Sequence, residues 1–168
     1  MIDTHQITSQ SRQRLLRETR QCLSDFAYYD DDRFILLEQT NKLSTRNHRA
    51  KGYLTYRQWV ETNATYRALK IEGLEHNDRI MQILRRHTKN KHQIVDVHAF
   101  ITNATGVSFK WHTDTLSVIL FNLSGCKYVS MSSKIIKLLP GQAVFIPAGT
   151  MHRVMSKKGS VALSIGVK

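Results

Sequence analysis

The stretch after residue 92 constrains the fold of this chain more than any other feature. It contains eight short strand-like segments in succession. Turn signals separate them, as at Gly125, Pro140-Gly141 and Lys158-Gly159. The segments are 93–101, 107–112, 116–124, 126–131, 134–138, 142–146, 151–156 and 160–167.

Many short strands joined by turns are typical of a sandwich, barrel or jelly roll. Eight strands in about 75 residues fit one double-stranded β-helix, the cupin-type jelly roll. We therefore predict a mainly β fold with N-terminal helices, in which the helices cover the outside of one sheet. The length of 168 residues predicts a single domain, with a helical part over 1–92 and a barrel core over 93–168.

Three helices are predicted before the barrel. Apolar residues recur at helical spacing over about 9–26, and Ser9 or Ser11 is a suitable N-cap. A second helix is predicted over about 55–71. A third is predicted to start near Asn77 and to end in the cations Arg85-Arg86-His87, which suit a helix C-terminus.

Two segments between these helices have other patterns. The short apolar run 33–38 fits a strand or a helix equally well. Segment 41–51 is polar and basic, so we predict an exposed loop there.

Composition excludes several classes of protein. Hydrophobic residues make up 41% and charged residues 23% of the chain, which is typical of a globular protein. No apolar run approaches the ~20 residues of a membrane span, and the N-terminus lacks the apolar core of a secretion signal. The two cysteines, Cys22 and Cys126, fit a reduced protein, so we expect a cytoplasmic location without membrane association.

The charge balance is strongly positive. Lys and Arg number 25 and Asp and Glu number 13, a net charge of +12, which favours a polyanionic partner. The candidate contacts to nucleic-acid phosphates are Arg46, Arg49, Lys51, Arg85 and Arg86. A solvated basic surface without a partner is the alternative interpretation.

Within the barrel segment, 93–168, there are only two carboxylates, Asp96 and Asp114. Asp114 lies two residues after His112 at the end of one strand, so the two side chains share a face. His152 begins another strand, which can lie beside the first in a jelly roll.

Two imidazoles and one carboxylate can occupy one face of an octahedral metal ion and leave three positions open. This is the facial triad of non-haem Fe(II) oxygenases. A single His-x-Asp or a single strand histidine is more often structural, but the combination in this order favours a metal site. A hydrolase of the Gly-x-Ser-x-Gly type is disfavoured because the motif is absent, and a zinc site would require a cysteine or a third histidine.

Two stretches, Trp111–Val129 and Leu138–Val154, resemble the JmjC-type and asparaginyl-hydroxylase-like cupins, which are Fe(II)- and 2-oxoglutarate-dependent oxygenases. The resemblance covers less than half of the chain. It implies that His112, Asp114 and His152 are the metal ligands. It also implies that Lys127, in the pattern Gly-x-Lys, pairs with the far carboxylate of 2-oxoglutarate. A lysine supplies a point charge with three donors for such a carboxylate.

The family often has a hydroxyl residue three positions before the first histidine ligand, where this sequence has Phe109. A substitute for this second 2-oxoglutarate anchor is therefore needed, and Asn122 and Ser164 are our main candidates. Further candidates are Thr102, Ser108 and Ser130. His98 is interpreted as a hydrogen-bonded core histidine. Arg153 could reach an anion, and a solvated strand arginine is an equally good interpretation.

The resemblance implies an enzyme that couples oxidative decarboxylation of 2-oxoglutarate to hydroxylation or oxidative demethylation of a substrate. A protein side chain or an RNA-associated target is the expected substrate class, and a small molecule stays open. The alternative function is a non-catalytic or metal-sensing cupin module that binds nucleic acid through its basic surface.

Overall fold

The computed structural model describes residues 7–25, 34–40, 44–49, 66–88, 93–102, 105–132 and 134–168. Its helices are α1 (Ser9–Asp25), the short 3-10 helix η1 (Leu74–His76) and α3 (Asp78–Thr88). Its strands are β1 (Phe34–Thr40), β2 (Ser44–Arg49), β3 (Tyr66–Ile71), β4 (Ile94–Thr102), β5 (Gly106–His112), β6 (Ser117–Ser124), β7 (Lys127–Met131), β8 (Lys134–Leu138), β9 (Ala143–Ile146), β10 (His152–Ser156) and β11 (Val161–Val167).

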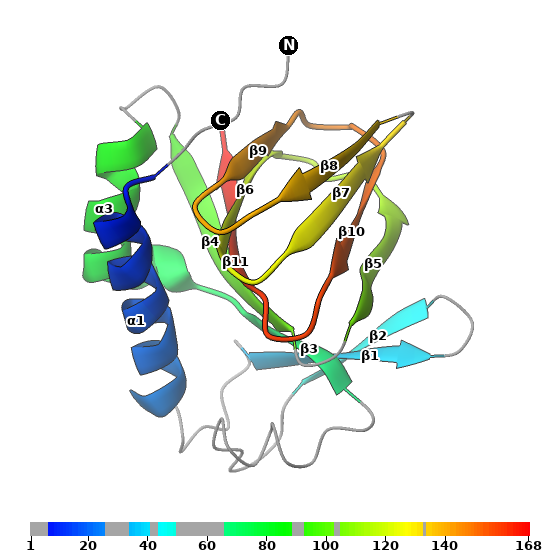
Figure 1. Cartoon of the computed structure of the whole chain (residues 1–168), viewed down its shortest axis with the longest axis horizontal. Coiled ribbons are helices and arrows are strands. Elements are labelled where there is room, and N and C mark those ends of the chain that lie inside the picture. The colour runs from blue at the N-terminus through cyan, green and yellow to red at the C-terminus, as the bar shows by residue number, and fades with distance from the viewer. Residues whose placement is uncertain are drawn as a thin grey trace.

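The strands form two antiparallel sheets that face each other. The larger has seven strands in the order β2-β1-β3-β4-β11-β6-β9, and the smaller has four in the order β5-β10-β7-β8. Figure 1 shows the two sheets wrapped around a common interior, with α1 and α3 on the outside of the larger one. The predicted jelly roll with helices on one sheet is therefore confirmed. In the described part of the chain, no helix is long and apolar enough to cross a membrane.

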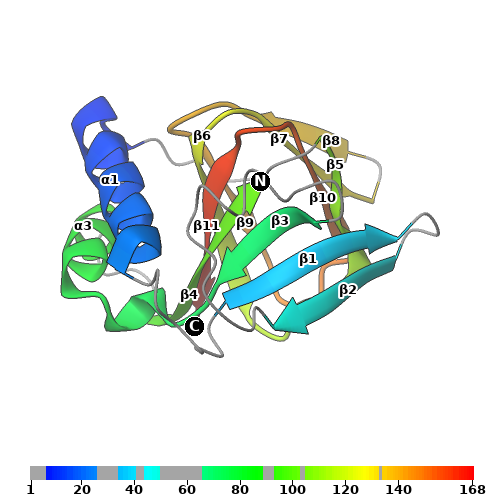
Figure 2. The same ribbon diagram turned by 90° about the horizontal axis from the view of Figure 1, so that it is seen from below.

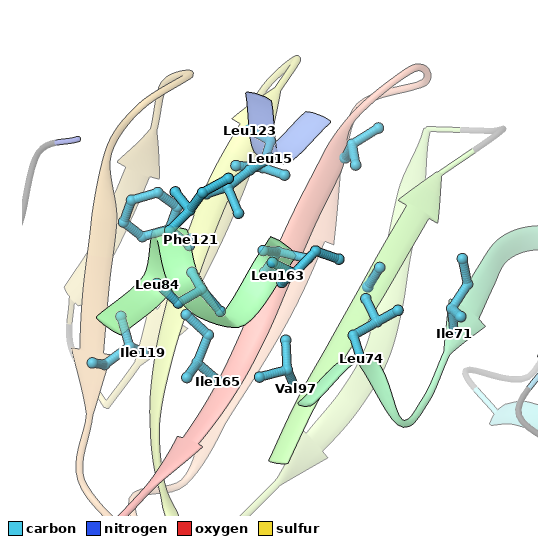
Figure 3. Packing of buried hydrophobic residues seen from close by; sticks show 14 of the residues in the cluster. Leu15, Ile71, Leu74, Leu84, Val97, Ile119, Phe121, Leu123, Leu163 and Ile165 are labelled. Carbon is cyan, nitrogen blue, oxygen red and sulfur yellow. The ribbon is translucent and has the colours of Figure 1, made fainter. Parts of the chain in front are cut away.

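The central strands of the larger sheet, β11 and β6, are buried on both faces. In β11, the odd-numbered residues from Val161 to Val167 pack against the helices, whereas Ala162 faces the barrel interior. Figure 3 shows Leu15 of α1 and Leu84 of α3 against this sheet. Because both faces are covered, the central strands carry nearly continuous apolar runs.

Side-chain caps begin both long helices. The Ser11 N–H donates to the Thr8 hydroxyl (3.2 Å), so the N-cap of α1 is Thr8 and the prediction of Ser9 or Ser11 was wrong. The Ile80 N–H donates to the Asn77 amide oxygen (3.1 Å), as expected for a helix that starts after Asn77.

Strands in the N-terminal part correct two predictions. The predicted helix over 55–71 is wrong at Tyr66–Ile71, which is β3 and pairs with both β1 and β4; residues 55–65 lie outside the described residues. The predicted loop over 41–51 contains β2, an edge strand that pairs only with β1. The ambiguous run 33–38 belongs to β1, apart from Arg33, which is not described. Figure 2 shows these strands side by side, extending the larger sheet.

Two tight turns meet at the closed end of the barrel. The β6–β7 turn contains Gly125 at φ +68°, and a Cβ atom there would lie 2.8 Å from the Ser160 Cα in the β10–β11 turn. Gly159 has a similar φ of +79°, but its Cβ would have no neighbour within 4 Å. Substitution of Gly159 therefore tests backbone strain alone, whereas substitution of Gly125 tests backbone strain together with a steric clash.

Replacing Gly125 with alanine is expected to lower the free energy of unfolding by roughly 3 kcal/mol, because the left-handed backbone and a backbone clash both oppose the side chain. The control, Gly159→Ala, is expected to lower it by only about 1 kcal/mol, since it meets the backbone term alone. Urea unfolding of both variants measures the difference. Equal losses would contradict the close contact between the two turns.

Candidate metal centre

The space between the two sheets contains a cavity of about 250 Å³ that opens at one end of the barrel. Both carboxylates of the barrel segment, Asp96 and Asp114, line it. The other lining residues are Lys70, His98, Phe100, His112, Thr115, Leu116, Val118, Leu120, Lys127, Ile146, His152, Val154, Ser164 and Gly166. The cavity thus combines an apolar wall with charged groups at its mouth and in its depth.

His112 and His152 form a cross-strand pair between β5 and β10. Their ring centroids are 4.2 Å apart. Asp114 follows His112 after the strand ends, and its carboxylate oxygens lie 3.9 Å from His112 Nε2 and 3.5 Å from His152 Nε2. One donor atom from each of the three side chains lies within 4.8 Å of the other two. The register of one strand pair therefore brings together residues that are distant in sequence.

Hydrogen bonds fix which ring nitrogen of each histidine faces the centre. His112 Nδ1 lies 2.7 Å from the Lys110 carbonyl oxygen, and His152 Nδ1 lies 2.9 Å from the Thr150 carbonyl oxygen. A carbonyl only accepts, so each Nδ1 carries the proton and donates it. In a neutral ring the Nε2 lone pair then points toward Asp114, which is the tautomer that a metal ligand needs.

The loop with Asp114 and the turn before His152 are tied together. The Gly149 N–H donates to the Asp114 carbonyl (2.9 Å), and the Ala148 N–H donates to the Ser117 hydroxyl (3.1 Å). His152 is 3% exposed, whereas His112 and Asp114 are 33% and 38% exposed. The site is anchored on one side and open on the other. Two imidazoles and a carboxylate in this arrangement fit one face of an octahedral divalent metal.

Lys127 lies in the depth of the same cavity. Its side chain is 1% exposed, and its Nζ donates to the Ser156 hydroxyl at 2.7 Å. No carboxylate partner is described for it in the resolved ranges of the chain, and burial lowers the pKa of Lys127 to about 7. A buried cation without an anionic partner is unfavourable for stability. An anionic ligand in the cavity would offset that cost.

A second polar cluster lies on the wall formed by the larger sheet. The Gly166 N–H donates to Asp96 Oδ1 (3.1 Å), and a Cβ atom on Gly166 would lie 2.3 Å from that oxygen. Glycine at 166 therefore makes room for the carboxylate. His98 Nε2 lies 3.7 Å from the same oxygen. Burial lowers the pKa of His98, the charge of Lys70 lowers it further, and Asp96 opposes the shift.

His98 differs from the prediction of a satisfied core histidine. It lines the cavity, and its buried Nδ1 has no hydrogen-bond partner among the described residues. Lys70 was missed because it lay in a segment predicted as helical. On β3 it pairs with Phe100 of β4, which brings it to the cavity wall.

The residues predicted as the second 2-oxoglutarate anchor differ in whether they line the cavity. Ser164 lines the cavity opposite His98 on the neighbouring strand. Asn122 does not line it: the Asn122 side-chain N–H groups donate to the Gly125 and Leu138 carbonyls, both at 3.0 Å, and so hold two turns. Thr102 and Ser130 are buried outside the lining.

The side chains of Ser108 and Phe109 lie outside the described residues. Ser156, the partner of Lys127, was missed by the sequence analysis. Counting every second residue from His152 along β10 would have placed Ser156 on the inner face.

Of the predicted phosphate contacts, only Arg85 and Arg86 have described side chains, and neither lines the cavity. Arg85 and Arg86 are exposed in the last turn of α3, on the helical side of the larger sheet in Figure 1. Arg46 and Arg49 belong to β2, with side chains that are not described, and Lys51 lies outside the described residues. Arg153 is half-buried, and its guanidinium carbon lies 5.1 Å from the centre of the Trp111 ring.

Comparison with known proteins finds similar solved structures. No protein-family model and no curated protein sequence matches the chain. The structure of YcfD, a ribosomal oxygenase from Escherichia coli, in complex with cobalt and 2-oxoglutarate superimposes with a TM-score of 0.72 at 12% identity. The match covers 100% of this chain and 48% of that one. A structure of YcfD with cobalt and succinic acid gives a TM-score of 0.67 at 16% identity, covering 87% and 42%.

This chain shares its fold with the YcfD structures. It spans less than half the length of the YcfD chains that it matches. At this identity the likeness shows the fold, and the chemistry has to be argued from the residues in the cavity.

Proposed function

We propose that the protein is a non-haem iron oxygenase that uses 2-oxoglutarate to hydroxylate, or oxidatively demethylate, a substrate held at the cavity mouth. The observation that carries the proposal is the convergence of His112 Nε2, His152 Nε2 and the Asp114 carboxylate at the mouth of a cavity with a buried lysine. The structures of YcfD with cobalt and 2-oxoglutarate or succinic acid support it at the level of the fold.

The spacing of these groups suits a five-carbon dicarboxylate. Ser156 lies four residues after His152 on β10, or about 13 Å along the strand at ~3.3 Å per residue. A lysine side chain and a short dicarboxylate can together span that separation, with one end of the acid at the triad. Lys127 would then bind the far carboxylate, and the Ser156 hydroxyl, 2.7 Å from Nζ, would orient the ammonium group.

Each residue of the chain has a defined role in this proposal. The two imidazoles hold the metal through neutral nitrogens, and Asp114 neutralises part of its charge. When bound, iron and 2-oxoglutarate supply the oxidising power through reaction with dioxygen. Val118, Leu120 and Ile146 exclude water from one side of the cavity. Since Asp114 fills the carboxylate position, the proposed outcome is hydroxylation or demethylation rather than transfer of a halide.

The substrate would approach from the open side, past the wall of Asp96 and His98. A protein side chain or an RNA-associated group is the substrate class we propose, because the mouth is polar and the protein has a net charge of +12. A carboxylate and an imidazole on this wall can accept hydrogen bonds from a polar substrate.

Anaerobic addition of Fe(II) and then 2-oxoglutarate tests the proposal. We expect a visible metal-to-ligand charge-transfer band that needs both components. Tight metal binding without the band would instead support a metal-sensing cupin module. If the protein bound no metal at all, a binding module without metal would be the better interpretation.

A further inference from the structure

The outer face of the four-stranded sheet carries a distinctive set of exposed side chains. Neither α1 nor α3 covers this face, because both lie beyond the larger sheet in Figure 1. Across the face, Arg153 of β10 is paired with Ser130 of β7, which is paired with Ile135 of β8. Ile135 is 71% exposed and Trp111, on β5, is 45% exposed. Large apolar side chains and cations therefore share one surface.

Trp111 and Arg153 form a fixed pair on this face. The Arg153 guanidinium carbon lies 5.1 Å from the centre of the Trp111 ring, within the range of a cation–π contact. The Nε atom of Arg153 is buried and has no hydrogen-bond partner in the described ranges. The arginine is thus positioned by its contact with the ring.

The charge of the surrounding surface has one sign. From residue 105 to the C-terminus, the sequence has eight Lys and Arg residues and a single carboxylate, Asp114. Asp114 faces the two histidines inside the cavity, and the buried Lys127 also faces inward. Lys137 is exposed on β8 and shares the outer face with Ile135, whereas Lys134, paired with Met131, alternates to the inner side at the exposed start of the strand. On the outer face, the cations Lys137 and Arg153 are therefore not paired with a carboxylate from that part of the sequence.

We propose that this outer face binds a single-stranded nucleic acid. Its cations would contact phosphates, and Trp111 would stack on a base. The exposed Trp111 ring lies among cations, and an unpaired nucleic-acid strand offers both phosphates and flat bases to such a surface. An acidic peptide offers charges but few flat aromatic groups, so it matches this surface less well. The proposal does not depend on the oxygenase chemistry.

The proposed surface adjoins the mouth of the cavity. Trp111 directly precedes His112, and the exposed Met151 and the stacked Arg153 flank His152. The same two strands thus present the metal triad on their inner face and the Trp111–Arg153 pair on their outer face. A nucleic acid bound on this face would hold the other components of its complex near the candidate metal centre.

Binding of a labelled single-stranded RNA of about 12 nucleotides, followed by fluorescence anisotropy on the full chain without metal, tests the proposal. Replacing Lys137 with glutamate is expected to weaken binding by about threefold or more and to reduce the salt dependence. The matched control reverses one exposed cation on the opposite side of the molecule, Arg86→Glu. We expect it to change the affinity less than twofold.

Stacking is tested separately from charge. Trp111→Ala is expected to weaken binding by roughly tenfold, whereas Trp111→Phe retains a ring and most of the affinity. Quenching of tryptophan fluorescence by the RNA should be present in the wild type and lost in Trp111→Phe. Thermal unfolding of each variant checks that it folds.

Three results would overturn the proposal. The first is an affinity that depends on Arg86 but not on Lys137. The second is displacement of the RNA by polyglutamate at equal charge concentration, which would indicate an acidic protein partner. The third is unchanged binding by Trp111→Ala together with equal affinity for double-stranded RNA, which would indicate attraction by charge without stacking.

Discussion

Replacing Asp114 with alanine is expected to reduce the affinity for Fe(II) at least 100-fold and to abolish turnover of 2-oxoglutarate. Loss of groups that only support a ligand costs about 10- to 100-fold in metal affinity, so loss of a ligand should cost no less. Asp114 is the sole anionic member of the triad, and both histidine Nε2 atoms lie within 4 Å of its oxygens. Isothermal titration under anaerobic conditions measures the affinity, and succinate formation measures turnover.

The second cavity carboxylate provides the matched control for metal binding. Asp96→Asn removes a negative charge from the same cavity but is not part of the triad. We expect it to leave the Fe(II) affinity nearly unchanged. If the two substitutions weakened metal binding equally, the metal would respond to the overall charge of the cavity, and the assignment of a three-residue site would be wrong.

Replacing Lys127 with methionine is expected to change binding and stability in opposite directions. Affinity for 2-oxoglutarate should fall about 100-fold or more, since a buried charge partner is lost. The free energy of unfolding at pH 7 should rise or stay constant, because methionine fills similar space without a buried charge. Calorimetric titration and urea unfolding measure the two effects. Weakened 2-oxoglutarate binding with strong destabilisation would indicate a structural role instead.

The pH dependence of stability provides an independent check on Lys127. Its pKa is about 7 in the folded protein and 10.5 when unfolded, so between these values the unfolded state binds more protons. The stability contribution of this group therefore rises with pH over that window, and its cost is complete below pH 7. The difference in unfolding free energy between wild type and Lys127→Met should shrink as pH rises. Lys137→Met, at an exposed site on the adjacent strand, should show no such slope.

The same titration affects the cosubstrate. Only protonated Lys127 can pair with a carboxylate, and the bound anion raises the pKa of Lys127. Affinity for 2-oxoglutarate should therefore decline above about pH 7, by at most tenfold per pH unit. In Lys127→Met this decline should disappear. A decline of equal slope in the variant would assign it to another group.

The barrel could be predicted from the sequence because its local signals agree with its pairing. Turn residues such as Gly125 and Pro140-Gly141 mark the ends of strands, and alternation places His112 and Asp114 together. The eight segments lie within about two residues of the observed strands. The triad followed from the same alternation, since the two histidines come from strands that neighbour each other in a jelly roll.

Strands before the barrel depended on partners that the sequence pattern does not reveal. Tyr66 and Leu69 are spaced as on a helix, yet β3 lies between β1 and β4, and that position determines its conformation. β2 is polar, as suits an edge strand, and so resembles a loop. Lys70 was therefore unpredictable as a cavity residue. Ser156, by contrast, could have been found by alternation from His152.

The pairing of His112 with His152 has a consequence for the order in which this protein assembles. The two residues are 40 positions apart, and β5 and β10 can align only after the intervening hairpins have formed. Closing such a long loop is an entropic obstacle that slows the folding of barrels. The triad is consequently among the last features to be completed. The metal of the proposed site should therefore bind to a barrel that has already folded, rather than guide its folding. Once bound, it should slow the unfolding of the barrel, because it links the ligands of β5 and β10.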